Sequence, residues 1–191
     1  MVTKRLRIFI PAVAVLLLFA GVSLLAGLQL GGAAAARELL DPGVFVRFAA
    51  PVSRGLVNIS ISVMLGSLLF AMFALNPKKR EWRVLLDLAA ASAAVLTVVC
   101  LVSIIVTYSD VSGLPLSAAP QFGAGLWQFV TQFELGQLWL MLLVLAAVTA
   151  VCCFAVRGRK MLILPLATAV LTTFPLAAQG HAAGASGHSL A

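Results

Sequence analysis

Five long apolar stretches constrain what this chain can fold into. They lie near residues 8–30, 57–75, 88–107, 138–156 and 161–178. Each is close to the roughly 20 residues that a helix needs to cross the hydrocarbon core of a bilayer. A helix satisfies its backbone N–H and C=O groups within its own segment, which an open strand in lipid cannot do. The sequence therefore predicts an all-α, polytopic membrane protein with about five transmembrane helices, forming a single domain over residues 1–191.

The composition excludes a soluble domain. Hydrophobic residues make up 62% of the chain and charged residues only 10%, whereas a soluble domain carries roughly 25% charged residues. The formal net charge of +7 is also typical of nucleic-acid binding, but the basic residues lie in short clusters between apolar stretches, where membrane topology places them. We therefore expect the lipid bilayer, and no nucleic acid, as the partner of this surface.

The distribution of lysine and arginine predicts the orientation of the chain. Ten of the thirteen basic residues precede the first stretch, or lie between the second and third or the fourth and fifth, and only Arg37, Arg47 and Arg54 fall elsewhere. Basic residues concentrate in cytoplasmic loops, so the N-terminus is predicted inside and, after five crossings, the C-terminus outside. The first stretch also resembles a signal peptide, but it is longer than the usual apolar region of about 7–15 residues, which favours a retained helix.

Local patterns outside the apolar stretches predict further elements. Residues 37–43 are expected to form a short helix ended by the Pro-Gly turn. Residues 44–48 are expected in the membrane interface, and residues 126–134 as an amphipathic surface helix before the fourth span. Trp82 and Tyr108 are expected as interfacial anchors at opposite ends of the third span.

Small residues within the spans predict helix packing. Asn58, Ser62 and Gly66 follow one another at helical spacing, which suits close packing, with a polar conduit as the alternative. Residues 89–94 are nearly all small and are expected to form a second packing face. In the fifth span, Pro165 and Pro175 are expected to kink the helix.

Few side chains inside the apolar stretches are charged or sulfur-containing. Asp87 lies one turn from Arg83, so a salt bridge at a solvated helix end is expected in preference to a functional intramembrane carboxylate. The cysteines are all in apolar stretches and predict no disulfide framework: Cys100, Cys152 and Cys153. The chain carries no phosphate-binding loop, dinucleotide fingerprint, zinc-protease motif or nucleophile elbow, so no enzyme is expected.

The two histidines of the chain, His181 and His188, lie in a glycine-rich segment directly after the last apolar stretch. Imidazole binds copper, zinc, nickel and iron. The two rings are two turns apart if the segment is helical, and a loop would also allow both to reach one ion. Two histidines make an incomplete site, and Glu134 or a backbone carbonyl is a candidate third ligand. A solvated tail with incidental histidines is the alternative.

Six short segments carry a resemblance to a known family. They are Asp41-Pro42-Gly43 followed by residues 51–54, then residues 109–117, 133–136, and 180–183 with 187–191. In this order they resemble the N-terminal part of actinobacterial membrane proteins that fuse a copper-resistance D region to a cytochrome c oxidase assembly region. The family architecture continues beyond this portion into further helices.

The resemblance implies copper binding, transport or delivery at the bacterial plasma membrane, linked to copper tolerance and cytochrome c oxidase assembly. It implies His181 and His188 as copper ligands, with Met64 or Cys100 as remote candidates for a Cu(I) path. The expected partners are the bilayer, the copper ion, and cytochrome c oxidase or other respiratory supercomplex subunits. The alternative is a structural accessory or assembly subunit of a respiratory complex, with no metal role.

Overall fold

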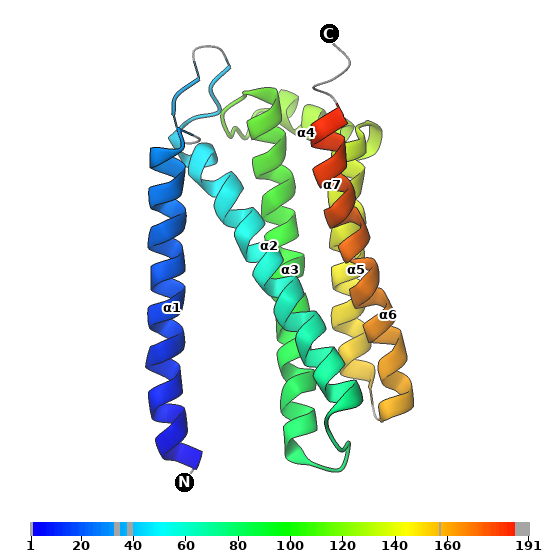
Figure 1. Ribbon diagram of the computed structural model, residues 1–191. Helices are drawn as coiled ribbons and strands as arrows, with labels where there is room; N and C mark the ends of the chain where they lie inside the picture. Colours follow the sequence, from blue (N-terminus) through cyan, green and yellow to red (C-terminus); the bar gives the residue numbers. More distant parts are fainter. Residues whose placement is uncertain (1, 33–34, 38–39, 157, 186–191) are drawn as a thin grey trace.

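The computed structural model describes residues 2–32, 35–37, 40–156 and 158–185, and within them the side chains of 15–16 and 18–180. Every regular element in this part of the chain is a helix, which confirms the all-α class. The elements are α1 (Val2–Leu30), α2 (Val44–Phe73), α3 (Arg80–Ser112), α4 (Pro120–Gln132), α5 (Glu134–Ala155), the 3₁₀ turn η1 (Arg159–Leu162), α6 (Ile163–Leu171) and α7 (Thr173–Ala185) (Figure 1).

Four helical segments are long and apolar enough to cross a membrane: α2, α3, α5 and the run Arg159–Gly180 through α6 and α7. They correspond to the second to fifth predicted spans. The first predicted span lies in α1, a continuous helix in which Leu18–Leu30 forms a shorter apolar stretch among the described side chains. Multi-pass insertion is therefore supported by four segments, while the crossing by α1 stays a prediction.

The helices form an elongated bundle whose two ends differ in composition (Figure 1). The N-terminus, the α2–α3 loop and the turn before α6 lie at one end, which we call the basic end because it carries Lys78, Lys79, Arg80, Arg83, Arg159 and Lys160. The α1–α2 segment, α4 and the C-terminal part of α7 lie at the opposite end, which we call the tail end. The grouping of basic loops that the sequence predicted is thus present in the fold.

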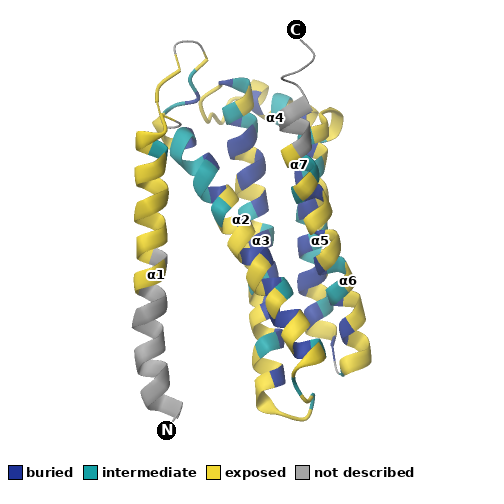
Figure 2. Cartoon of the chain, in the orientation of Figure 1, coloured by how far each residue is buried: buried dark blue, intermediate teal, exposed yellow. Residues whose placement is uncertain are grey.

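The core lies between α3 and the two helices with which it makes its most extensive contacts, α2 and α5. Ala89, Ala90 and Ala93 of α3 are buried, which confirms the predicted packing face at residues 89–94. Figure 2 shows buried residues gathered on the facing sides of α2, α3 and α5, and exposed residues on their outer sides. The facing sides also contribute these larger buried side chains: Val57, Ile61, Met64, Leu68, Leu96, Cys100, Trp139 and Leu142.

The predicted packing stripe on α2 is wrong. Asn58, Ser62 and Gly66 are exposed, and a Cβ added at Gly66 would meet nothing within 4 Å. The small polar residues that α2 does bury are Ser53, Ser60 and Ser67. Because α2 is apolar almost all round, two stripes of small residues were available, and the sequence pattern did not show which one faces α3.

The predicted interfacial anchor Trp82 is also wrong, because its side chain is only 3% exposed. Its indole N–H donates a hydrogen bond of 3.1 Å to the carbonyl of Ala71 in the last turn of α2. The last carbonyls of a helix have no partner within the helix, so this bond caps α2 and closes the α2–α3 turn. Tyr108, at the other end of α3, packs edge-on against Phe122 of α4 with ring centroids 5.0 Å apart.

The α1–α2 connection differs from the prediction. The described residues 35–37 and 40–43 are not helical, so the short helix expected over residues 37–43 is wrong. Leu40 and Gly43 have φ values of 55° and 94°, in the left-handed region where a right-handed helix cannot continue. Residues 44–48, expected in the membrane interface, form the start of α2, where Phe45 is exposed and Val46 is buried; their position relative to the bilayer stays a prediction.

Two predictions about local helix structure have clear outcomes. The amphipathic helix expected before the fourth span is confirmed as α4, which buries Phe122 and Phe129. The expected break near Pro175 is present, since α6 ends at Leu171 and α7 begins at Thr173. Pro165 does not interrupt a helix: it lies in the first turn of α6, where backbone N–H groups have no partner within the helix to lose.

A pair of glycine substitutions tests the packing of α5 against α4. A Cβ at Gly136 would lie 2.1 Å from the backbone carbonyl oxygen of Phe129, so Gly136→Ala forces the backbone to move. We expect Gly136→Ala to lower the free energy of unfolding in mixed detergent micelles by about 1–3 kcal/mol. The control Gly66→Ala faces open space and should be neutral or slightly stabilising, by up to about 1 kcal/mol. Equal free energies of unfolding for the two variants would contradict this packing of α5 against α4.

Candidate functional site at the tail end of the bundle

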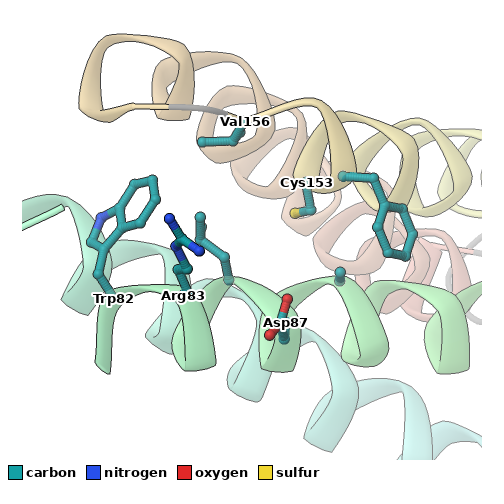
Figure 3. Close-up of a pocket in the computed structure, with 8 residues that line it drawn as sticks. Trp82, Arg83, Asp87, Cys153 and Val156 are labelled. Atoms are coloured by element: carbon teal, nitrogen blue, oxygen red, sulfur yellow. The ribbon is translucent and has the colours of Figure 1, made fainter. Parts of the chain in front are cut away.

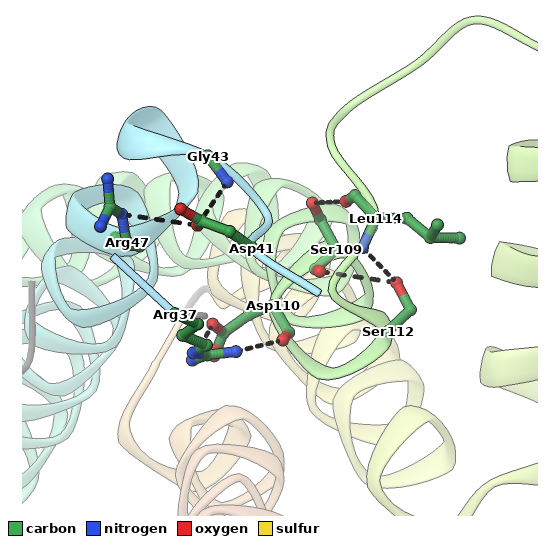
Figure 4. A network of polar contacts seen from close by, with 8 residues as sticks. All are labelled: Arg37, Asp41, Gly43, Arg47, Ser109, Asp110, Ser112 and Leu114. Carbon is green, nitrogen blue, oxygen red and sulfur yellow. Dashed lines mark hydrogen bonds and ion pairs between the residues drawn. The ribbon is translucent and has the colours of Figure 1, made fainter. Parts of the chain in front are cut away.

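An ion pair connects the α1–α2 segment to the end of α3. The guanidinium of Arg37 lies 2.7 Å from the carboxylate of Asp110 and donates a second hydrogen bond, 2.9 Å, to the Asp110 backbone carbonyl (Figure 4). The Arg37 side chain is 49% exposed and that of Asp110 is 21% exposed. The pair thus fixes the position of the segment at a partly hydrated surface.

A second group of contacts stabilises the same connection. One carboxylate oxygen of Asp41 accepts a 3.0 Å hydrogen bond from the Gly43 N–H and lies 3.6 Å from Nε of Arg47 (Figure 4). Gly113, in the loop after α3, has a φ of +68°, and a Cβ there would lie 2.4 Å from Leu40. Only glycine therefore allows the loop after α3 to approach the segment before α2 this closely.

A cavity of about 280 Å³ lies at the tail end between α2, α5 and α7. Its apolar wall comes from Val57, Leu135 and Leu176. The remaining lining residues carry hydrogen-bond donors or expose backbone: Arg54, Asn58, Trp139, Gln179 and Gly180. Trp139 is 1% exposed, and neither its indole N–H nor the buried side-chain nitrogen of Gln179 has a hydrogen-bond partner. The sequence reasoning did not find this cavity, because its walls come from three separate helices.

Segments that are far apart in the sequence converge on this end of the bundle. Arg54, Leu135 and Gly180 each belong to a different segment of the family resemblance, and all three line the 280 Å³ cavity. Two further segments, residues 41–43 and 109–117, lie close together, because Leu40 beside the first approaches Gly113 and Arg37 pairs with Asp110. The tail end is therefore the place where the resembling segments that the structure describes come together.

Of the two predicted copper ligands, His181 belongs to the C-terminal part of α7. His181 follows Gly180 directly and is part of α7, but its side chain lies outside the part of the structure whose side chains are described. His188 lies outside the described residues altogether. Their assignment as ligands stays a prediction. What the structure shows is that the backbone leading to His181 forms part of the cavity wall.

The other predicted ligands lie in two different environments, one at the surface and two in the core. Glu134 is exposed at the first turn of α5, and nearby Gln137 donates a 2.8 Å hydrogen bond to the Thr131 carbonyl. Met64 and Cys100 are fully buried in the apolar core. Among the residues that the structure describes, no group of three His, Cys, Asp or Glu side chains could hold a metal ion.

A second cavity, of about 490 Å³, opens at the basic end (Figure 3). Arg83, Asp87 and Cys153 are among the residues on its wall. The predicted salt bridge between Arg83 and Asp87 is wrong, because the two side chains form no ion pair within 4.0 Å. Both are exposed, and pairing two hydrated side chains gains little free energy over their separate hydration.

Substitution of Asp110 tests the ion pair that connects the α1–α2 segment to α3. Asp110→Asn removes the charge facing Arg37, and we expect it to lower the free energy of unfolding by at most about 1 kcal/mol, because the pair is partly exposed. Limited proteolysis should show faster cleavage between α1 and α2. The control Asp87→Asn removes an exposed carboxylate that has no ion pair, and should leave both measurements unchanged. Equal cleavage rates for the two variants would argue against the connection.

Comparison with known proteins identifies the family. Residues 39–190 match the family described as Copper resistance protein D-like, N-terminal domain. The match includes α2 to α7 and both histidines. Searches of curated proteins and of solved structures find no match to the chain. The chain therefore belongs to the copper resistance protein D-like family, as a multi-pass membrane protein with a copper-related function.

Proposed function

We propose that the protein binds copper at its tail end, on the outer face of the bacterial plasma membrane, and transfers it by ligand exchange without enzymatic chemistry. The observation that carries the proposal is the position of His181. It follows Gly180 on α7, beside a cavity on which three of the resembling segments converge. The family match supports copper as the metal, and the position of His181 beside the cavity supports the tail end as the place of the proposed site.

The proposed ligands are His181 and His188. They are the only histidines in the chain, and imidazole is a good ligand for copper. The glycines between and around them allow the backbone to bring both rings to one ion. Glu134 is the proposed third ligand, because it is exposed at the start of α5 and is followed by Leu135, which lines the cavity next to α7.

We confine the proposed exchange to the tail end. Met64 and Cys100 offer soft sulfur atoms suited to Cu(I), but both are completely enclosed by the apolar side chains of the core. A copper ion could reach them only if α2 and α3 separated. From the resemblance, we propose that copper bound at the tail end serves copper tolerance and delivery toward cytochrome c oxidase.

A copper titration tests the proposal. The purified chain and a His181→Ala/His188→Ala double variant are titrated with copper, and Ser186→Ala/Ser189→Ala serves as a control in the same segment. We expect the histidine variant to lose at least about 100-fold in affinity, because weakening even the partners of metal ligands costs 10–100-fold. The serine variant should bind as the original chain does. Equal copper affinity in all three proteins would remove the histidines from the site and favour the accessory-subunit role.

A further inference from the structure

We propose that the cavity between α2, α5 and α7 is a binding site for a small anion with oxygen acceptors, a carboxylate or a phosphate. The cavity is the 280 Å³ space lined by Arg54, Asn58, Trp139 and Gln179. This site is distinct from the proposed copper ligands and does not depend on copper binding.

The first argument is the indole of Trp139. Its N–H can only donate a hydrogen bond, it is buried, and it has no acceptor among the residues that the structure describes. A buried donor without a partner is costly, and most such groups in folded proteins are paired with protein, water or ligand. Since Trp139 lines the cavity, an acceptor bound there would complete its hydrogen bonding.

The second argument is the charge of Arg54. The other two arginines of the tail end each face an acid: Arg37 lies 2.7 Å from Asp110, and Arg47 lies 3.6 Å from Asp41. Arg54 forms no ion pair with any described residue. Its guanidinium presents a planar set of donors that matches the oxygens of carboxylates and phosphates.

The two amide side chains complete a donor-rich lining. The side-chain nitrogen of Gln179 is buried without a partner, and Asn58 lies on the same wall. No Asp or Glu lines the cavity. Apolar side chains form the rest of the wall. Arg54 and Asn58 are exposed, whereas Trp139 is buried, so it is the hydrogen bond from the indole that a low-dielectric surrounding would strengthen.

This chemistry selects an anion over the other ligand classes. A copper ion would face the positive charge of Arg54 and an indole that cannot coordinate it, and a neutral ligand would leave that charge unpaired. Arg54 and Asn58 also line a neighbouring cavity of about 460 Å³ whose wall includes Arg37, Arg47 and Asp110. Because Arg37 and Arg47 are each paired with an acid, Arg54 supplies the unpaired positive charge that favours the approach of an anion. The acceptor oxygens have two available sources, an anion in solution or the phosphate of a lipid headgroup.

Thermal unfolding of the full chain tests the site. The protein is purified in dodecyl maltoside, and its Tm is measured against sodium acetate and sodium phosphate at constant ionic strength, since a ligand of the folded state raises Tm with its concentration. Arg54→Gln and Trp139→Phe are compared with Arg83→Gln, which removes an exposed arginine at the basic end. In parallel, native mass spectrometry counts phosphatidylglycerol molecules retained by each protein.

If the anion comes from solution, acetate or phosphate raises the Tm of the original chain and of Arg83→Gln. Arg54→Gln then binds about 10–100-fold more weakly, the range expected for losing a charged hydrogen bond, and Trp139→Phe about tenfold more weakly. If the source is a lipid, the original chain and Arg83→Gln retain a phosphatidylglycerol that Arg54→Gln and Trp139→Phe lose. The proposal is overturned if neither the Tm response nor lipid retention distinguishes the two cavity variants from Arg83→Gln.

Discussion

The arrangement of the bundle depends on the small-residue face of α3. Ala89, Ala90 and Ala93 bring α2 and α5 close to α3 on either side. Within lipid, helices gain little from hydrophobic association, so close van der Waals packing of small residues is a main source of stability. The same packing sets the distance between α2 and α5 at the tail end, where Arg54 of one and Trp139 of the other line one cavity with α7. The candidate site is therefore a consequence of how α3 packs.

The two ends of the bundle use their charged residues differently. At the basic end, exposed lysines and arginines surround the loops, and Arg83 and Asp87 remain unpaired on the cavity wall. At the tail end, the Arg37–Asp110 pair joins the connection before α2 to the end of α3, and Arg47 faces Asp41 within that connection. Charge at the basic end is thus suited to defining topology, whereas charge at the tail end builds local structure and leaves Arg54 available for a ligand.

The sequence predicted the fold better than the site, for a physical reason. Apolar length alone identifies segments that cross a membrane, so the second to fifth spans were found and only their ends were extended, as at α2. Which face of a helix is buried depends on its neighbours, and an almost wholly apolar helix carries no contrast between faces. The predictions that the stripe containing Asn58 is packed and that Trp82 lies in the interface were therefore wrong. The cavity at the tail end could not be predicted from the sequence, because its residues come together only when the helices pack.

The central claim is that the tail end, with its cavity and the histidine-bearing end of α7, faces the outside of the cell. Single cysteines introduced at two exposed positions, Ser117 near the tail end and Lys79 at the basic end, test it most directly with a membrane-impermeant maleimide. The native cysteines lie within α3 and α5, and the unsubstituted chain reports their background. We expect Ser117→Cys to be labelled in intact cells and Lys79→Cys only after permeabilisation. The reverse labelling pattern would contradict the account.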